Sequence, residues 1–414
     1  MRLVCWLALG LFCFIHTTHA GGIKLSLLGQ RQQAMGFSGT ALYGGASSLW
    51  YNPGALPFTR YRVDLEFGFT ASRPATTYLE NSFSREQVET DTTVLTPVTA
   101  YAAWRGKKGG KWEKWSLGLG VFSPFGILTR WPDDWEGKFV IQDFTVNTLY
   151  AQPTIAYQLT DQMGFGVGFT YALANMGITR ALQVDGANGS VGAVDFSGVG
   201  QGFGANVGWF ARINPKLALG IKYQTPVKIK MPGGTARFTV PESLVDQYPE
   251  QEISTDLPLP GMLHVGLSYQ AEDLFLITFD MKFTQWQTFD SLNIELEEPV
   301  PNLLFHPERN FQPSRSFHLG GEYAASSHIW IRGGTYYDSS PVPEDYVSPD
   351  IPDADRIGVT LGGGFLVWKT LYIDLSGGFE FTGERTARFQ QAQFSGIYES
   401  RIWNLGLGIR YGIK

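Results

Sequence analysis

Past its first twenty residues the chain contains no cysteine, because Cys5 and Cys13 both precede that point. Residues 1–20 have the plan of an export signal. A basic start is followed by an apolar run that is too short to span a bilayer, and Thr18 and Ala20 supply the small side chains expected before a cleavage site. The absence of cysteine excludes the small secreted proteins that depend on disulfides, and metal sites built on thiolates.

Charge and long apolar runs are also scarce. Charged residues make up 17% of the chain, against about 25% in soluble domains. The formal charge of −6 argues against nucleic acid as a partner. No apolar run after the signal is long enough for a membrane-spanning helix. In contrast, the chain has 49 glycines and 14% aromatic residues. This combination is typical of a membrane β-barrel, in which apolar side chains occupy every second position.

The last segment of the chain shows this alternation most clearly. Trp403, Leu405 and Leu407 fall on one face, and Asn404 and Arg410 fall on the other. The same period of two recurs along the chain. It identifies 14 segments: residues 60–72, 95–105, 115–123, 146–159, 164–180, 201–213, 216–230, 261–271, 274–286, 315–324, 328–338, 357–368, 371–382 and 401–413.

The links between these segments alternate in length. Short links, such as residues 214–215 and 369–370, alternate with links of about twenty residues or more, such as 231–260; residues 106–115 are a medium-length exception in the short set. A soluble β-sandwich does not require such alternation, whereas a barrel with short periplasmic turns and long outer loops does. The sequence therefore predicts an all-β protein, a 14-stranded antiparallel transmembrane barrel over residues 60–414, in the outer membrane.

Large aromatic residues lie near several predicted strand ends, where interfacial girdles form in membrane barrels. Ordinary packing is the alternative interpretation for any single one of them. The residues expected in the girdles are Tyr150, Trp209, Trp286, Trp330, Trp368 and Trp403.

Residues 21–59 precede the strands and have little alternation and little charge. A disordered leader is expected to be polar and charged. This segment instead carries apolar side chains, among them Met35, Phe37 and Trp50, which need a place to be buried. The barrel lumen is the available place, so we expect the segment to plug it.

The third predicted strand is interrupted. Pro124 has no N–H to donate to a ladder, and Gly126 follows it. A break in a barrel wall is tolerated only where the freed backbone lines a cavity or contacts protein. One interpretation is a gap in the wall with Ser123, Pro124, Phe125 and Gly126 at its rim. The other is that Pro124 simply ends the strand.

Three stretches resemble the FadL-type outer-membrane long-chain fatty acid transporters. Residues 29–56 (GQRQQAMGFSGTALYGGASSLWYNPGAL) resemble the family's N-terminal hatch, and residues 123–139 (SPFGILTRWPDDWEGKF) resemble the segment after its third strand. Residues 331–356 (IRGGTYYDSSPVPEDYVSPDIPDADR) resemble a late block of the family. The resemblance implies a plugged 14-stranded barrel. A hydrophobic ligand would bind inside and leave sideways, by passive diffusion, through a gap at the third strand.

The family's Asn-Pro-Ala motif falls on Asn52 and Pro53, with Gly54 in place of the alanine. Glycine has wider backbone freedom, so we expect the substitution to loosen the turn. We also expect this turn to act as a gate that faces the break at Pro124.

A fatty acid carboxylate needs a cation, and Arg332 suits it because its planar fork can bind both oxygens. Lys222, Lys282 and Arg410 are further lumen candidates, and pairing with strand carboxylates is the alternative for all four. Asp353, Asp355 and Arg356 are expected to tie an outer loop by charge-assisted hydrogen bonds. The candidate ligand-binding residues are Met35, Phe37, Trp50, Phe125, Ile127, Leu128, Trp131 and Arg332, with Trp135 beside them.

These observations predict a monomeric transporter of long-chain fatty acids, in contact with outer-membrane lipid. A channel for aromatic or alkane hydrocarbons, and a plugged barrel that acts as an adhesin or structural surface protein, are the alternatives. Catalysis, metals and cofactors are not expected, since His264 and His318 are scattered and no known catalytic motif occurs. A barrel enzyme would need a serine and a histidine within hydrogen-bond reach.

Overall fold

The computed structural model of the protein describes residues 22–80, 87–184, 191–300 and 307–414. The export signal predicted for residues 1–20 lies outside these ranges. The strands are β1 (Val63–Leu79), β2 (Val88–Glu89), β3 (Val98–Arg105), β4 (Trp115–Phe122), β5 (Gly126–Arg130), β6 (Asp143–Gln158), β7 (Met163–Gln183), β8 (Val191–Arg212), β9 (Leu217–Gln224), β10 (Val227–Thr239), β11 (Gln251–Leu259), β12 (Met262–Glu272), β13 (Phe275–Thr284), β14 (Ile294–Leu296), β15 (Ser314–Ala324), β16 (Ile329–Asp338), β17 (Arg356–Trp368), β18 (Leu371–Thr382), β19 (Arg385–Phe389) and β20 (Phe394–Ile413). The helices are α2 (Gln30–Ala34), α3 (Ser48–Tyr51) and the 3-10 helices η2 (Pro53–Phe58), η3 (Glu242–Gln247), η4 (Trp286–Thr288), η5 (Glu344–Tyr346) and η6 (Gln390–Ala392).

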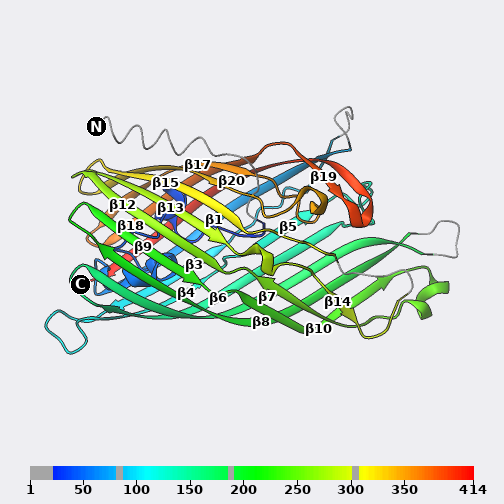
Figure 1. Ribbon diagram of the computed structural model, residues 1–414, viewed down its shortest axis with the longest axis horizontal. Helices are drawn as coiled ribbons and strands as arrows, with labels where there is room; N and C mark the ends of the chain where they lie inside the picture. Colours follow the sequence, from blue (N-terminus) through cyan, green and yellow to red (C-terminus); the bar gives the residue numbers. More distant parts are fainter. Residues whose placement is uncertain (1–21, 81–86, 185–190, 301–306) are drawn as a thin grey trace.

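These strands form one closed antiparallel barrel (Figure 1). Six barrel strands consist of two pieces each: β2 with β3, β4 with β5, β9 with β10, β11 with β12, β13 with β14 and β18 with β19. The 20 segments therefore make 14 barrel strands, as predicted. The barrel closes where β1 pairs with β20, from Val63 opposite Ile413 to Leu79 opposite Ile397. Closure leaves no strand with unpaired backbone groups, and this is a requirement for a barrel in lipid.

The alternation of the last strand has the predicted orientation. Trp403 and Leu405 are 60% and 71% exposed on the outer surface, whereas Asn404 is buried. Arg410 points inward, where its guanidinium bonds Asp64 of β1. Each of the 14 predicted segments overlaps one barrel strand, because an outward apolar row produces a local signal every second residue.

Several strands extend further than predicted. β8 begins at Val191 and β20 at Phe394, and β10 and β11 occupy much of the predicted loop 231–260. In these extensions polar side chains such as Asp195 and Ser197 lie on the exposed face. The apolar row that identifies a lipid-facing strand is therefore missing there.

The short turns and both barrel termini lie at one end. β17 and β18 are separated by residues 369–370, and the start of β1 lies beside the end of β20 (Figure 1). In outer-membrane barrels the short-turn end faces the periplasm.

The predicted aromatic girdle is right only in part. Trp368 is exposed on the outer surface like Trp403, and Trp209 and Trp330 are half-buried. Tyr150 and Trp286, however, are completely buried. Tyr150 belongs to the inward row of β6, and Trp286 follows the end of β13 in η4. Both face the interior because position near a strand end does not determine the direction of the side chain.

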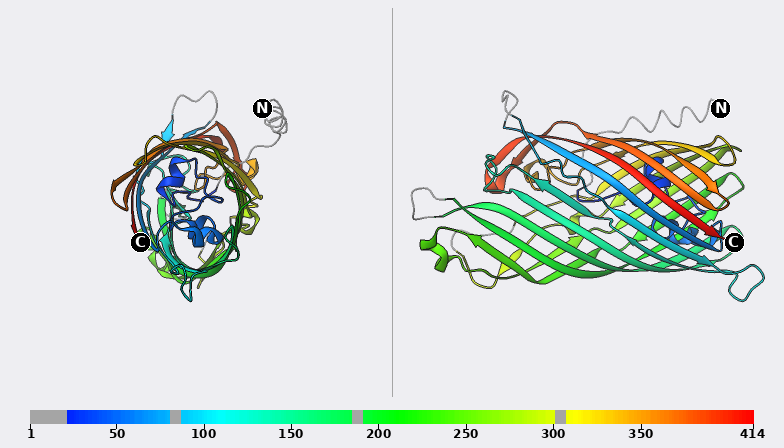
Figure 2. Two further views of the ribbon diagram at one scale, coloured as in Figure 1. Left: turned by 90° about the vertical axis from the view of Figure 1, so that its left-hand side faces the viewer. Right: turned by 180° about the vertical axis from the view of Figure 1, so that it is seen from behind.

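Residues 22–59 lie inside the ring of strands, which is seen end-on in Figure 2 (left). α2, α3 and η2 belong to this N-terminal segment, and most of its side chains are buried. Within the described residues, no helix has the length and apolar character needed to cross a bilayer.

Candidate functional site

Asn52 ties the N-terminal segment to the wall. Its Oδ1 accepts a hydrogen bond from Gly54 N at 3.0 Å. Its Nδ2 donates to Thr40 O and to Trp209 O of β8, both at 2.9 Å. The side chain is completely buried, so these three bonds satisfy an amide that has no access to water.

Gly54 does not loosen this turn, and the expectation that it would is wrong. A Cβ at Gly54 would lie within 2.8 Å of Gly208 O, Gly164 O and Phe210 N. These are backbone atoms of β7 and β8, which cannot rotate away as side chains can. The glycine is needed here for close approach to the wall rather than for conformational freedom.

The turn also does not face the break, contrary to the prediction. Pro53 lies against Gly166 of β7 and Gly208 of β8, on the far side of β6 from the third barrel strand. Sequence alone could not place it, because its partners are glycines more than a hundred residues away in the chain.

The third barrel strand is interrupted but does not end at Pro124. β4 and β5 both pair with β6, with Phe122 opposite Tyr150 and Gly126 opposite Asn147. Between these two pairs the third strand advances by four residues and β6 by only three, so the third strand contains a bulge of one residue. On the other side, β3 pairs with β4 only as far as Val121. The interpretation that Pro124 terminates the strand is excluded.

The N-terminal segment meets this break from inside. Leu25 N donates to Pro124 O, and Gly126 N donates to Ile23 O, both at 2.9 Å. Phe125 N donates to the Thr148 hydroxyl, which in turn donates to Phe125 O. The N-terminal segment and the Thr148 side chain of β6 thus satisfy backbone groups at the break in place of ordinary ladder bonds.

A cavity of about 110 Å³ lies beside the break. It is bounded by the N-terminal segment, by β5 and by the outer half of β1. Ile127 and Leu128 line it, as the prediction of a ligand-binding role requires. Its lining residues include Lys24, Leu25, Pro74, Leu95, Gly126, Ile127, Leu128, Asp353, Arg356 and Ile402.

Pro74 is a lining residue that the sequence analysis missed. It lies in β1 between Ser72, which bonds Leu95, and Thr76, which bonds Thr90. Because proline has no N–H, Pro74 cannot donate a backbone hydrogen bond to the second barrel strand. The second barrel strand leaves the ladder at this point, so two prolines, Pro74 and Pro124, flank the cavity. The predicted segment ended at residue 72, so Pro74 fell in a predicted loop, although a proline two residues beyond a predicted strand is itself a signal of an interruption.

Phe125 and Trp50 belong to an aromatic column in the lumen. The Phe125 ring lies 6.2 Å from both Tyr150 and Trp286, and Trp50 lies 4.8 Å from Phe122. Met35 and Phe37 are also buried, but they pack against the opposite wall, where Phe37 meets Tyr336 at 5.0 Å. They do not line the cavity at the break.

Trp131 and Trp135 lie in the outer loops and stack at 4.5 Å. Tyr78, Phe394 and Tyr398 pack around them. Both indoles are buried, and Trp131 Nε1 donates to Pro349 O. They form a closed cluster rather than an open surface for ligand capture.

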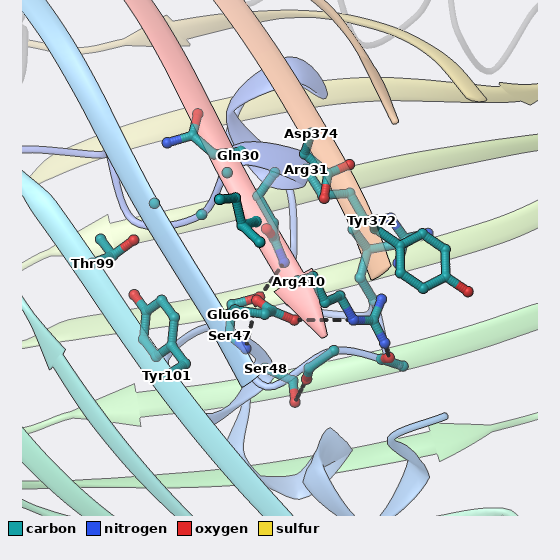
Figure 3. Close-up of a pocket in the computed structure, with 18 of the residues that line it drawn as sticks. Gln30, Arg31, Ser47, Ser48, Glu66, Thr99, Tyr101, Tyr372, Asp374 and Arg410 are labelled. Carbon is teal, nitrogen blue, oxygen red and sulfur yellow. Dashed lines mark hydrogen bonds and ion pairs between the residues drawn. The ribbon is translucent and has the colours of Figure 1, made fainter. Parts of the chain in front are cut away.

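Arg332 belongs to a charge network. Its guanidinium bonds Glu322 at 2.7 Å and also bonds Asp374, and Arg31 of the N-terminal segment shares Glu322. These residues border a cavity of about 370 Å³ at the periplasmic end, where Arg31, Asp374 and Arg410 converge (Figure 3). A ligand role for Arg332 stays a prediction, and its partners show the alternative of mutual pairing.

The other lumen lysines also contact the N-terminal segment. Lys282 Nζ donates to Phe37 O at 2.8 Å. Lys222 Nζ lies 3.5 Å from the centre of the Trp50 ring. Between them, Asp280 accepts bonds from the backbone of Gly39 and Thr40. The inward charged side chains thus hold the N-terminal segment at several positions along the barrel axis.

Asp353 and Asp355 hold the outer loop together. Asp353 accepts from Ser340 Oγ at 2.6 Å and from Gly22 N at 3.2 Å, and Asp355 accepts from the Tyr337 hydroxyl. Arg356 lies 3.7 Å from Asp353. Burial raises the pKa of the Asp355 carboxyl to about 6. The same residues therefore reach from the loop to the start of the N-terminal segment.

Three histidines lie in the described part of the chain, His264, His318 and His328, and these three form no recognisable catalytic group. His318 Nδ1 contacts Gly36 O at 2.8 Å. A serine–histidine contact does occur, between Ser327 and His328, but these are consecutive residues of an exposed turn. Within the described residues, no group of three or more His, Cys, Asp or Glu side chains is arranged to hold a metal ion.

Residues 11–412 match the family described as outer membrane protein transport protein (OMPP1/FadL/TodX). The chain belongs to this family. Its place in the OMPP1/FadL/TodX family confirms the resemblance and the outer-membrane location. The long-chain fatty acid transport protein of Salmonella typhi is 23% identical over 323 residues, 72% of this chain and 73% of that protein. That of Escherichia coli K12 is 21% identical over 334 residues, 72% of this chain and 74% of that protein.

Solved structures of the family share the fold. A Pseudomonas aeruginosa FadL homologue superposes with a TM-score of 0.82 at 16% identity, covering 95% of this chain and 100% of that one. The Ralstonia pickettii toluene transporter TbuX gives 0.73 at 15% identity, covering 94% and 99%.

Proposed function

We propose that this barrel carries hydrophobic compounds, with long-chain fatty acids first among them, across the outer membrane by passive diffusion. The curated relatives described above are long-chain fatty acid transport proteins. The observation that carries the proposal is the cavity at the break, where Leu25, Ile127 and Leu128 offer an apolar surface in the wall itself.

The proposed exit is sideways, through the wall between β1 and β5. Pro74 and Pro124 remove ladder donors on both sides of the cavity. On its extracellular side, a hydrogen bond from Asp91 N to Arg130 O joins the residue after β2 to the end of β5. We expect the opening to lie at the outer interface of the bilayer, because the exposed Trp403 of β20 pairs with Arg73 of β1 beside it. An apolar ligand that leaves here would pass directly into lipid.

Two cations favour a carboxylate over a neutral hydrocarbon. Lys24 and Arg356 both line the cavity. Lys24 pairs with Asp338 at 3.2 Å, and Arg356 pairs with Glu380 at 3.4 Å. A fatty acid headgroup could share these donors while its chain lies along the apolar lining.

Uptake of labelled oleate by cells with and without the protein tests the proposal. Gly126→Val narrows the cavity, because a Cβ there already meets Leu25 at 3.0 Å, and we expect it to lower uptake severalfold. Gly177→Val is the matched control, since nothing lies within 4 Å of its Cβ position.

Equal oleate uptake by cells with and without the protein would contradict the proposal that it transports fatty acids. If toluene uptake depended on the protein and oleate uptake did not, the barrel would be a hydrocarbon channel. Dependence of neither compound on the protein would favour an adhesin or structural role.

A further inference from the structure

A basic surface lies on the periplasmic rim and takes no part in the proposed transport route. We call it the basic rim and define it by the side chains of Arg60, Arg62, Arg105, Lys369 and Lys414. With Tyr61 and Tyr372 among its neighbours, it borders a cavity of about 400 Å³.

Four separate parts of the chain build the basic rim. They are the residues before β1, the end of β3, the turn between β17 and β18, and the residue after β20. Backbone bonds fix their positions: Arg105 N donates to Arg62 O at 2.8 Å, and Gly412 N donates to Thr370 O at 3.0 Å. Among the described residues, no carboxylate side chain forms an ion pair with these five cations. The positive charge of the basic rim is therefore available to an external anion.

The neighbouring turn enlarges this surface. Residues 106–114 join β3 to β4 and contain Lys107, Lys108, Lys111 and Lys114. This basic loop extends beyond the barrel at its periplasmic end (Figures 1 and 2). Its one acid, Glu113, is occupied in accepting a bond from Gly109 N.

The five side chains of the basic rim lie on neighbouring strands, in one sector of this end of the barrel. Elsewhere at this end the charge is mixed: Glu272 ends β12, Asp273 lies in the turn that follows, Asp161 lies in the turn between β6 and β7, and Lys216 lies in the turn between β8 and β9. The chain as a whole has a formal charge of −6. A basic sector on an acidic protein indicates a specific anionic partner rather than a general charge excess.

Apolar side chains place the basic rim at the level of lipid headgroups. Trp368 and Tyr411, at the same end, are exposed on the outer surface, where aromatic belts mark the bilayer interface. Lys369 Nζ lies 4.9 Å from the centre of the Trp368 ring. Trp112, at the tip of the basic loop, is 55% exposed. Cations next to exposed indoles suit a membrane surface better than they suit an acidic protein in solution.

We propose that the basic rim and the basic loop bind the phosphates of anionic phospholipids in the periplasmic leaflet of the outer membrane. The headgroups would occupy the cavity between Arg60, Arg62 and Lys369, and the loop would lie along the leaflet surface with Trp112 inserted. This site is independent of the transport proposal, because it rests on a different end of the barrel.

Native mass spectrometry of the full-length mature barrel, released from bilayers of equal phosphatidylglycerol and phosphatidylethanolamine content, tests the site. The wild-type protein is expected to retain phosphatidylglycerol preferentially. In the triple variant Arg60→Gln, Arg62→Gln and Lys369→Gln, the preference should fall by roughly fivefold for each cation removed, the effect expected of a basic side chain beside an anionic surface. Lys107→Gln with Lys108→Gln should lower it further.

The matched control removes three cations of β10, away from the periplasmic end: Lys228→Gln, Lys230→Gln and Arg237→Gln. It should keep the wild-type preference, and circular dichroism and heat-modifiable gel mobility should show that all the variants fold. Equal retention of the two lipids by the wild-type protein would overturn the proposal. So would an equal loss in the control, or a basic rim that binds soluble polyaspartate but has no preference for phosphatidylglycerol.

Discussion

The N-terminal segment meets the barrel wall at two places that differ in kind. At the Asn52 turn, the backbones touch: Gly54 lies so close to β7 and β8 that a methyl group has no room, and Asn52 makes three buried bonds. At the break, residues 23–25 make two backbone bonds to the third strand beside an open cavity. The first contact is a close approach of two backbones, whereas the second combines two hydrogen bonds, one ion pair and the buried Ile23 side chain beside a cavity.

This difference separates anchoring from access. Backbones in direct contact tolerate little displacement without loss of many interactions, whereas a segment that borders a cavity has room to move locally. We therefore assign the Asn52 turn to holding the segment in the lumen and residues 22–25 to regulating the cavity. From the sequence the turn was expected to be the gate, because the turn and the break were expected to face each other.

The largest effect is expected from Gly54→Leu. Its side chain would collide with backbone atoms of Gly164 and Gly208, so the turn must leave its site, at a cost of about 3 kcal/mol. Limited trypsin digestion should then remove the N-terminal segment from an otherwise intact barrel. Gly177→Leu, on a position with free space, serves as the control. A segment as protected as in the wild type would show that the close approach is not required.

Asn52→Ala should have the next largest effect. It leaves Thr40 O buried without this donor and removes a second bond from Trp209 O, a carbonyl of the paired strand β8, which together cost about 2 kcal/mol. We expect faster amide exchange at residues 48–58 and increased entry of polar antibiotics, with the barrel still assembled. Exchange unchanged at the turn and faster at residues 22–25 would reverse the assignment of the two contacts.

Much of the barrel could be predicted because its signal is local. In a lipid-facing strand every second side chain is apolar, so a segment such as 401–413 can be recognised from its own residues. The contacts of the N-terminal segment carry no such signal, since the position of Gly54 depends on Gly164 and Gly208, which are distant in the chain. The inward direction of Trp286 likewise depends on a helical turn after β13 rather than on its own neighbours in sequence.

Removal of the ion pair at the break should have a smaller effect. Lys24 and Asp338 are 3.2 Å apart and almost buried, and loss of only one partner would leave an uncompensated charge. The double variant Lys24→Met, Asp338→Asn avoids this and should destabilise the segment by about 1 kcal/mol or less. Exchange at residues 22–27 should rise while that at Asn52 stays constant. A parallel rise at both places would mean that the segment moves as one unit.

The smallest expected effect is that amide exchange depends on pH at the break and not at the Asn52 turn. Burial raises the pKa of Asp355 from 3.8 to about 6 and raises that of Asp353 as well, and Asp353 accepts a bond from Gly22 N. Because the folded loop binds more protons than the unfolded chain between these values, its stability falls as the pH rises through 6. After correction for intrinsic rates, amides of residues 22–25 should exchange more slowly at pH 5 than at pH 7, and those of the Asn52 turn should not change. Asp355→Asn should weaken the dependence. If the turn responded to pH as strongly as the break does, the two contacts would be coupled and the division between anchor and access would fail.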